Sequence, residues 1–125
     1  MKRVIFAAAL LAAVILLNIL CIHIVADIKN DITEKLDTLY EAASEGPEEA
    51  AALCGEFTEY WIEKSHILCR IVRHDLIDQI TIAVARFAPL AEYGEIGELS
   101  AEILRCKILL EEIWDSEMPF FRNIF

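Results

Sequence analysis

This chain of 125 residues lacks the short sequence signatures of enzymes and nucleotide-binding proteins. It has four glycines, all isolated from one another, so no glycine-rich loop is present to cradle a phosphate group. Its four cysteines form neither a Cys-x-x-Cys pair nor a Cys-x-x-Cys-His haem-attachment motif. No Ser/His/Asp ordering typical of a hydrolase is present. We therefore expect a protein that is not an enzyme, with no catalytic residues, no cofactor and no metal.

Basic residues and strand signals are scarce as well. The chain has 11 Lys and Arg residues against 21 Asp and Glu residues, a formal net charge of −10. Binding to nucleic acid or to anionic lipid requires a basic surface, so this balance argues against both. No sustained apolar–polar alternation and no Asn-Gly or Asp-Gly dipeptide occurs, and this absence argues against strands and hairpins. The fold class that remains is all-α.

The chain has one long apolar run, from Val4 to Ala26, in which Asn18 and His23 are the polar side chains. A helix rises about 1.5 Å per residue, so a helix of this length can cross the hydrocarbon core of a bilayer, which is roughly 30 Å thick. The run accounts for the positive mean hydropathy of the chain. The sequence therefore predicts a membrane-spanning helix.

Three interpretations of this segment compete. A cleaved secretory signal has a shorter apolar region and a stronger cleavage site than Ile24-Val25-Ala26. A lipoprotein signal would use Cys21, but the preceding Leu20 is larger than the small residue usual there. An uncleaved signal anchor fits best. We predict a transmembrane anchor over residues 1–26 and an acidic helical domain over residues 27–125.

Charge also predicts the orientation of the anchor. Lys2 and Arg3 precede the apolar run, and every acidic residue follows it. Cytoplasmic flanks of membrane helices are enriched in Lys and Arg, so we expect a cytoplasmic N-terminus and an extracytoplasmic domain in the cell membrane. Within the run, the spacing of Ala8 and Ala12 and the amide of Asn18 would support association with another membrane helix.

Apolar periodicity predicts four helices. The first continues from the membrane run without a break signal and ends near Gly46-Pro47, where glycine suits a helix end and proline a helix start. The second runs from about Pro47 to Val72, with a bend near 73–75. Buried faces at helical spacing are expected at the following positions: Ile28, Ile32, Leu36, Leu39, Ala43, Ala50, Cys54, Phe57, Trp61, Leu68 and Val72.

The third helix is predicted to begin at a cap formed by Asp75, to kink or end at Pro89, and to close at Tyr93-Gly94. The fourth is predicted from about Glu95 to Glu117, ended by Met118-Pro119 and followed by an apolar tail. Short turns between helices favour antiparallel neighbours. We therefore expect the transmembrane helix to continue into a small antiparallel four-helix bundle or two stacked helical hairpins.

Two groups of residues have spacings seen in metal sites. Glu63 and His66 match the Glu-x-x-His spacing of di-iron bundles, but a second motif is missing and both positions lie opposite the apolar stripe. His66, Cys69 and His74 could be imagined as ligands of zinc or haem, without a fourth ligand at metal-site spacing. We interpret these residues as a solvated helix face and a helix junction. The cysteines are interpreted as core residues.

The chain also has more apolar surface than a bundle of this size needs to bury. Ile82 and Ala85 lie away from the main stripe of the third helix, and Leu104 and Ile108 lie opposite that of the fourth. Either these two helices are central and covered on two sides, or one face of them meets a partner. The tail likewise either folds back to cap the bundle or meets a partner. The candidate interaction surface comprises Leu104, Ile108, Phe120, Phe121, Ile124 and Phe125.

Several segments of the chain resemble a known family. They are Trp61, the stretch from His74-Asp75-Leu76-Ile77-Asp78 to Arg86-Phe87, and the terminal Asn123-Ile124-Phe125. The family is DUF4363, a domain of unknown function. Its members are short single-pass membrane proteins of spore-forming, anaerobic Gram-positive bacteria. The resemblance covers essentially the whole chain and implies a membrane helix followed by an acidic helical body. It implies no established activity.

These observations favour one function and leave one alternative. The favoured function is a membrane-tethered, non-enzymatic interaction module, an accessory subunit or scaffold that contacts a protein partner or a second copy of the chain. The alternative is a metal- or haem-binding extracytoplasmic helical protein that uses His66, Cys69 and His74.

Overall fold

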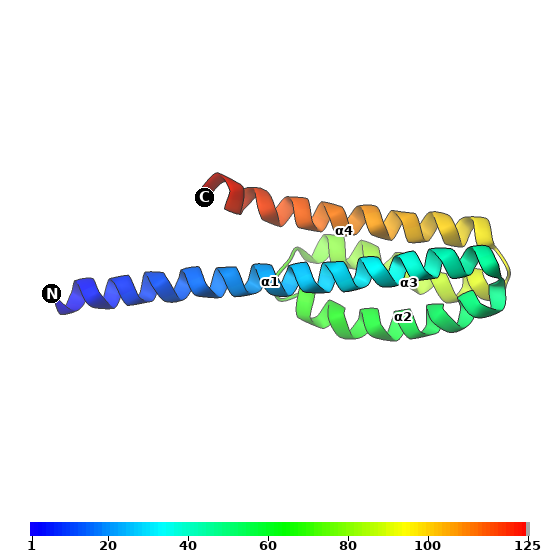
Figure 1. Ribbon diagram of the computed structural model, residues 1–125, viewed down its shortest axis with the longest axis horizontal. Helices are drawn as coiled ribbons and strands as arrows, with labels where there is room; N and C mark the ends of the chain where they lie inside the picture. The colour runs from blue at the N-terminus through cyan, green and yellow to red at the C-terminus, as the bar shows by residue number, and fades with distance from the viewer. Residues whose placement is uncertain (125) are drawn as a thin grey trace.

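The computed structural model describes the backbone of residues 1–124 and the side chains of residues 1–115. The chain forms four helices, α1 (Lys2–Glu45), α2 (Pro47–Leu68), α3 (His74–Glu92) and α4 (Ile96–Ile124), which run up and down in antiparallel order (Figure 1). α1 packs against α2 and α4, and α3 packs against the same two helices. The expected all-α fold, with a long apolar helix leading into a four-helix bundle, is therefore confirmed.

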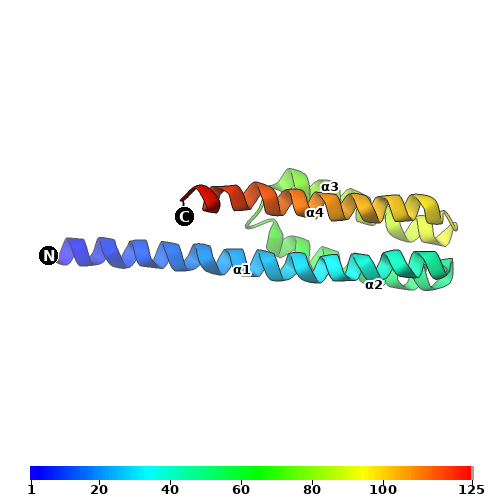
Figure 2. The ribbon, with the colours of Figure 1, turned by 45° about the horizontal axis from the view of Figure 1, so that its top comes forward.

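α1 consists of an exposed apolar part and a part that packs into the bundle. Its first turns, residues 1–20, are exposed along every face, and the most apolar part of the helix is not covered by any other element. Burial begins at Val25 and then recurs at Ile28, Ile32, Leu36 and Leu39, as the periodicity predicted. One uninterrupted helix therefore carries the apolar segment straight into the bundle (Figures 1 and 2).

The connection between α1 and α2 follows the sequence signals. Gly46 leaves the helix with an extended backbone, and its N–H still donates to the carbonyl of Ala42 at 3.1 Å. Pro47 starts α2, and Glu48 and Glu49 lie in its first turn, where carboxylates interact favourably with the positive helix end. This end of the bundle is therefore closed by a turn of a single residue.

The connection between α2 and α3 differs from the prediction. α2 ends at Leu68, not near Val72, because the chain tightens there: the N–H groups of Arg70 and Ile71 donate to carbonyls three residues earlier, at 3.2 and 3.0 Å. α3 begins at His74, and the predicted Asp75 cap is wrong, since Arg73 holds the capping position without a side-chain cap. Asp75 instead lies in the first turn, where its carboxylate accepts a hydrogen bond from the Arg73 guanidinium at 2.9 Å.

Two prolines interrupt the helices less than predicted. α3 passes through Pro89 and ends three residues later at Glu92, so the proline removes a hydrogen bond only near the end of the helix. The prediction that Met118-Pro119 ends the fourth helix is wrong, because α4 continues to Ile124. Proline loses one backbone donor, but its φ of about −65° is compatible with a helix, so the turns on either side remain helical.

The core lies on the central axis of the bundle and contains no charged side chain among the described residues. Trp61 is its largest member and is fully buried. The rings of Phe57 and Phe87 face each other with centroids 5.8 Å apart, which joins α2 to α3. Leu99, Ile103 and Cys106 supply the buried face of α4.

Candidate functional site

The described part of the candidate interaction surface lies on the outward face of α4. Leu104 is 45% exposed and Ile108 is 68% exposed, while Ile103 and Cys106 beside them are fully buried. Ile82 on α3 is exposed to a similar degree, at 62%, but no large apolar residue accompanies it one turn away on the same face. The two residues of α4 therefore form a short apolar ridge, one helical turn long.

The remaining members of that surface are Phe120, Phe121, Ile124 and Phe125, whose side chains lie outside the described residues. The backbone of α4 reaches Ile124 and brings this segment to the same side of the bundle as the exposed part of α1. Figures 1 and 2 both show the end of α4 extending past the turn between α2 and α3, toward the N-terminal end of α1.

The candidate metal ligands are separate surface residues. Glu63 and His66 are exposed, as the interpretation of a solvated helix face predicted. His74 is exposed at the start of α3, and Cys69 is half-buried after the end of α2. Within the described residues, no group of three or more His, Cys, Asp or Glu side chains is arranged to hold a metal ion. His66, Cys69 and His74 are therefore not brought together as a ligand set.

The four cysteines are free thiols. Cys54 and Cys106 are fully buried in the core, as predicted, whereas Cys21 and Cys69 are only half-buried. Burial raises the pKa of the Cys54 thiol to about 11. Burial, together with the nearby Glu102 carboxylate, raises the pKa of the Cys106 thiol to about 12. Both buried thiols are therefore protonated and unreactive at neutral pH.

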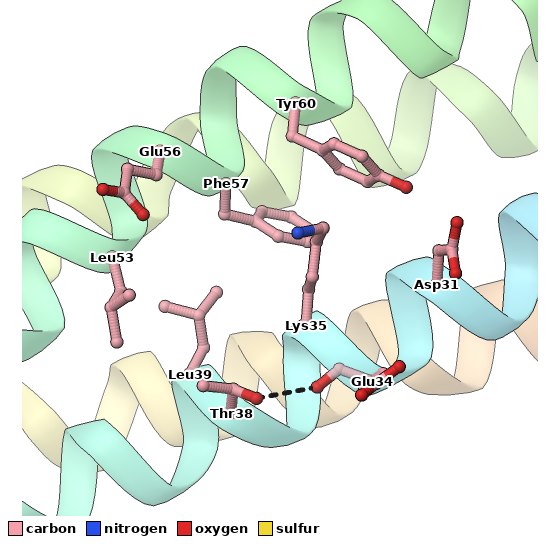
Figure 3. A pocket seen from close by; sticks show the side chains of 9 residues that line it. All are labelled: Asp31, Glu34, Lys35, Thr38, Leu39, Leu53, Glu56, Phe57 and Tyr60. Carbon is pink, nitrogen blue, oxygen red and sulfur yellow. Dashed lines mark hydrogen bonds between the residues drawn. The ribbon is translucent and has the colours of Figure 1, made fainter.

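A groove of about 510 Å³ lies between α1 and α2 and was not predicted from the sequence. Figure 3 shows its lining side chains. Carboxylates and one ammonium group surround an apolar floor. The lining residues are Asp31, Glu34, Lys35, Thr38, Leu39, Leu53, Glu56, Phe57 and Tyr60. Such a lining suits a positively charged group attached to an apolar body.

The pKa of Tyr60, which lines the groove, is shifted from its ordinary value. The buried hydroxyl of Tyr60 has no hydrogen-bond partner among the described residues, and the ring points across the groove toward Asp31 (Figure 3). Burial raises the pKa of Tyr60, and the negative charges of Asp31 and Glu63 raise it further. The ammonium groups of Lys35 and Lys64 lie 4.6 and 5.6 Å from the ring centroid. Lys35 and Lys64 therefore already make the cation–π contacts of the Tyr60 ring.

The two ends of the bundle differ in charge. The end farther from the exposed part of α1 holds the turn between α1 and α2 and the turn between α3 and α4 (Figure 1). Four of residues 41–49 and three of residues 92–98 are exposed glutamates, and neither segment contains Lys or Arg. The nearer end holds residues 66–75, which include Arg70, Arg73, two histidines and one acidic residue, Asp75, which pairs with Arg73. The net negative charge is therefore unevenly distributed.

Comparison with known proteins agrees with this architecture, an apolar helix that continues into an antiparallel four-helix bundle. The chain belongs to the family described as Domain of unknown function (DUF4363), whose model matches residues 19–124. The match begins inside the apolar segment of α1 and includes the whole bundle. No curated protein and no solved structure shows significant similarity to the chain.

Proposed function

We propose that this protein is a membrane-tethered, non-enzymatic interaction module. The apolar part of α1 anchors the bundle, and the apolar ridge of Leu104 and Ile108 contacts a protein partner or a second copy of the chain. The observation that carries the proposal is that Leu104 and Ile108 are both exposed one helical turn apart on the same face. The other large aliphatic side chains exposed on the described bundle, Ile62, Ile67 and Ile82, have no exposed large aliphatic neighbour one turn away. Contiguous exposed apolar surface on a folded domain marks sites of interaction.

Anchoring is supported by the length, composition and exposure of α1. The helix is apolar and long enough to cross a membrane, and its apolar part packs against no other element. Large exposed side chains such as Phe6, Leu10 and Leu16 would be unfavourable in water and favourable in hydrocarbon. The resemblance to single-pass membrane proteins points the same way. Lys2 and Arg3 support a cytoplasmic N-terminus and an extracytoplasmic bundle.

The absence of enzymatic activity is part of the proposal. The groove between α1 and α2, with a volume of about 510 Å³, could hold a substrate, but its lining residues include no serine, cysteine or histidine. Its carboxylates sit near Lys35 at the bundle surface, and the two buried thiols lie in the core with raised pKa values. These features support a role in binding.

The proposal is tested by recovery of a partner from membranes solubilised in mild detergent. The tagged full chain should recover a stoichiometric membrane protein or a second copy of itself. Ile108→Lys should reduce this recovery by at least about tenfold, because a charge would be placed in the centre of an apolar contact. Leu104→Lys should act in the same direction.

Ile82→Lys provides the matched control, since Ile82 has a similar exposure on another helix and no large apolar neighbour one turn away on its own face. Its recovery of the partner should equal that of the unchanged chain. A monomer with no partner, or an equal loss with Ile82→Lys and Ile108→Lys, would contradict the proposed contact.

A further inference from the structure

The start of the bundle coincides with the end of the apolar segment of α1. Val25 is the first buried residue of α1, and the exposed apolar stretch before it runs from Val4 to Leu20. A helix from Val4 to Ile24 measures about 30 Å, the thickness of the hydrocarbon core. If α1 spans the bilayer, as the proposed function holds, no spacer separates the bundle from the lipid headgroups.

The turn between α2 and α3 occupies this membrane-facing end. Leu68, the last residue of α2, lines one small void with Val25 of α1 and Trp114 of α4. These three residues therefore lie at the same height along the axis of the bundle. The turn that follows carries Arg70, which is exposed and forms no ion pair with the described side chains. Arg73 follows, with its side chain 66% exposed and paired with Asp75 at 2.9 Å.

α4 extends farther in the same direction. Trp114 is half-buried, and the ammonium group of Lys29 lies 5.2 Å from its ring centroid. From Trp114 to Ile124 the helix advances about 15 Å, and both ribbon views show this stretch on the N-terminal side of the turn. Its sequence is rich in apolar residues, including Phe120 and Phe121. Tryptophan is enriched at the boundary between hydrocarbon and water, where Trp114 would stand.

The net charge of the chain does not reveal how the charges are distributed between the two ends of the bundle. The net charge of −10 argues against contact with anionic lipid only if the charge is spread evenly. The exposed glutamates of 41–49 and 92–98 instead lie at the opposite end of the bundle, about 25 to 30 Å away along helices of this length. That separation is several Debye lengths at physiological ionic strength, so their repulsion is screened. At the membrane-facing end, α1 carries Asp27 two residues after Val25, and α4 carries Asp115 directly after Trp114. Both carboxylates are exposed.

We propose that the membrane-facing end of the bundle docks on anionic phospholipid headgroups of the bilayer that holds α1. Arg70 binds headgroup phosphate, and Arg73 assists it. The end of α4 passes the headgroups and enters the membrane beside α1, with Trp114 at the boundary between hydrocarbon and water. This docking holds the bundle upright with its acidic end away from the membrane, so the ridge of Leu104 and Ile108 faces sideways along the membrane plane. The inference rests on the proposed membrane anchoring of α1.

The test uses the full chain in lipid nanodiscs that contain either zwitterionic phospholipid alone or a mixture with anionic phospholipid. Quenching of Trp114 fluorescence by lipids that carry a quencher on the headgroup reports docking. Trp61 is fully buried about two turns above the end of α2, so it contributes a constant background. We expect stronger quenching in the anionic discs.

Arg70→Gln should lower the ratio of docked to undocked molecules in anionic discs by about fivefold, the effect of one basic residue near an anionic surface. Arg70→Gln combined with Arg73→Gln should lower it further. Arg105→Gln removes the same charge from the middle of α4, where the side chain is 49% exposed, and should leave the ratio unchanged.

Equal quenching in both kinds of disc, with no effect of Arg70→Gln, would overturn the docking proposal while leaving the anchoring intact. An equal loss with Arg105→Gln and Arg70→Gln would also overturn it, because a general charge effect would then explain the result. A chain that does not remain associated with the discs would instead contradict the proposed anchoring itself. The two failures are therefore distinguishable.

Discussion

Trp61 of α2 donates its indole N–H to the hydroxyl of Thr81 on α3, with a nitrogen–oxygen distance of 2.9 Å. The Thr81 hydroxyl in turn donates to the carbonyl of Ile77, one turn earlier in its own helix, at 2.9 Å. The largest buried side chain of the bundle therefore has its polar atom satisfied across a helix interface. This pair sets the relative position of α2 and α3.

Loss of the Thr81 hydroxyl should destabilise the bundle. Thr81→Val keeps the shape of the side chain but leaves the Trp61 N–H buried without a partner, which costs about 1–3 kcal/mol. The free energy of unfolding, measured with denaturant for the full chain in detergent, should fall by that amount. Thr58→Val is the matched control, because Thr58 donates only to Cys54 of its own helix. An equal effect of both substitutions would contradict a special role for the Trp61–Thr81 pair.

The two halves of α1 should respond differently to the same substitution. Leu36 is fully buried in the bundle, so Leu36→Ala should lower the free energy of unfolding of the bundle by about 2–5 kcal/mol. Leu17 lies on the same helix and is 61% exposed, so Leu17→Ala should leave bundle stability nearly unchanged. Denaturant unfolding followed by circular dichroism measures both. A large loss with Leu17→Ala would show that the apolar half is part of the bundle core.

The buried thiols should make the fold sensitive to alkaline pH. The pKa of Cys54 is raised from 9.0 to about 11 in the folded chain, and that of Cys106 from 9.0 to about 12. The unfolded chain therefore loses these protons first, and stability declines as the pH rises from about 9 toward the folded-state values. Below about pH 9 the contribution of these groups is constant.

Substitution of both cysteines by alanine tests this pH dependence. The double variant Cys54→Ala and Cys106→Ala should have a smaller decline in unfolding free energy between about pH 9 and pH 10.5 than the unchanged chain. Its stability at neutral pH should be lower, because two buried side chains are shortened. Identical slopes in the two proteins would contradict the assignment of raised pKa values to these thiols.

Much of the fold was predictable because it depends on apolar periodicity. The buried positions of α1 and α2 recur at the spacing that the sequence shows, and Gly46-Pro47 signals the turn between them directly. The ends near Leu68 and Ile124 were not predictable in the same way. The first depends on a tight turn that packs Val72 onto the core, and the second on a helix that continues through Pro119; no sequence pattern indicates either.

The candidate sites show a similar division. The exposure of Glu63 and His66 followed from their place opposite the apolar stripe, whereas the sequence left open whether Leu104 and Ile108 are exposed or covered by another helix. The groove at Tyr60 joins residues from two helices, and no pattern within either helix indicates it. The difference in charge between the two ends becomes visible only when the helices are placed in antiparallel order, which brings residues 41–49 beside residues 92–98 (Figure 1).

The most direct test of the account is the location of the bundle relative to the membrane. A full chain with Glu49→Cys, in a Cys21→Ser and Cys69→Ser background, carries an exposed thiol at the end of the bundle far from the apolar part of α1, while Cys54 and Cys106 stay buried. In intact cells, this thiol should react with a membrane-impermeant maleimide, and the labelled chain should stay in the membrane after alkaline extraction. Labelling only after the cells are permeabilised, or release of a soluble chain that begins near Asp27, would contradict the account.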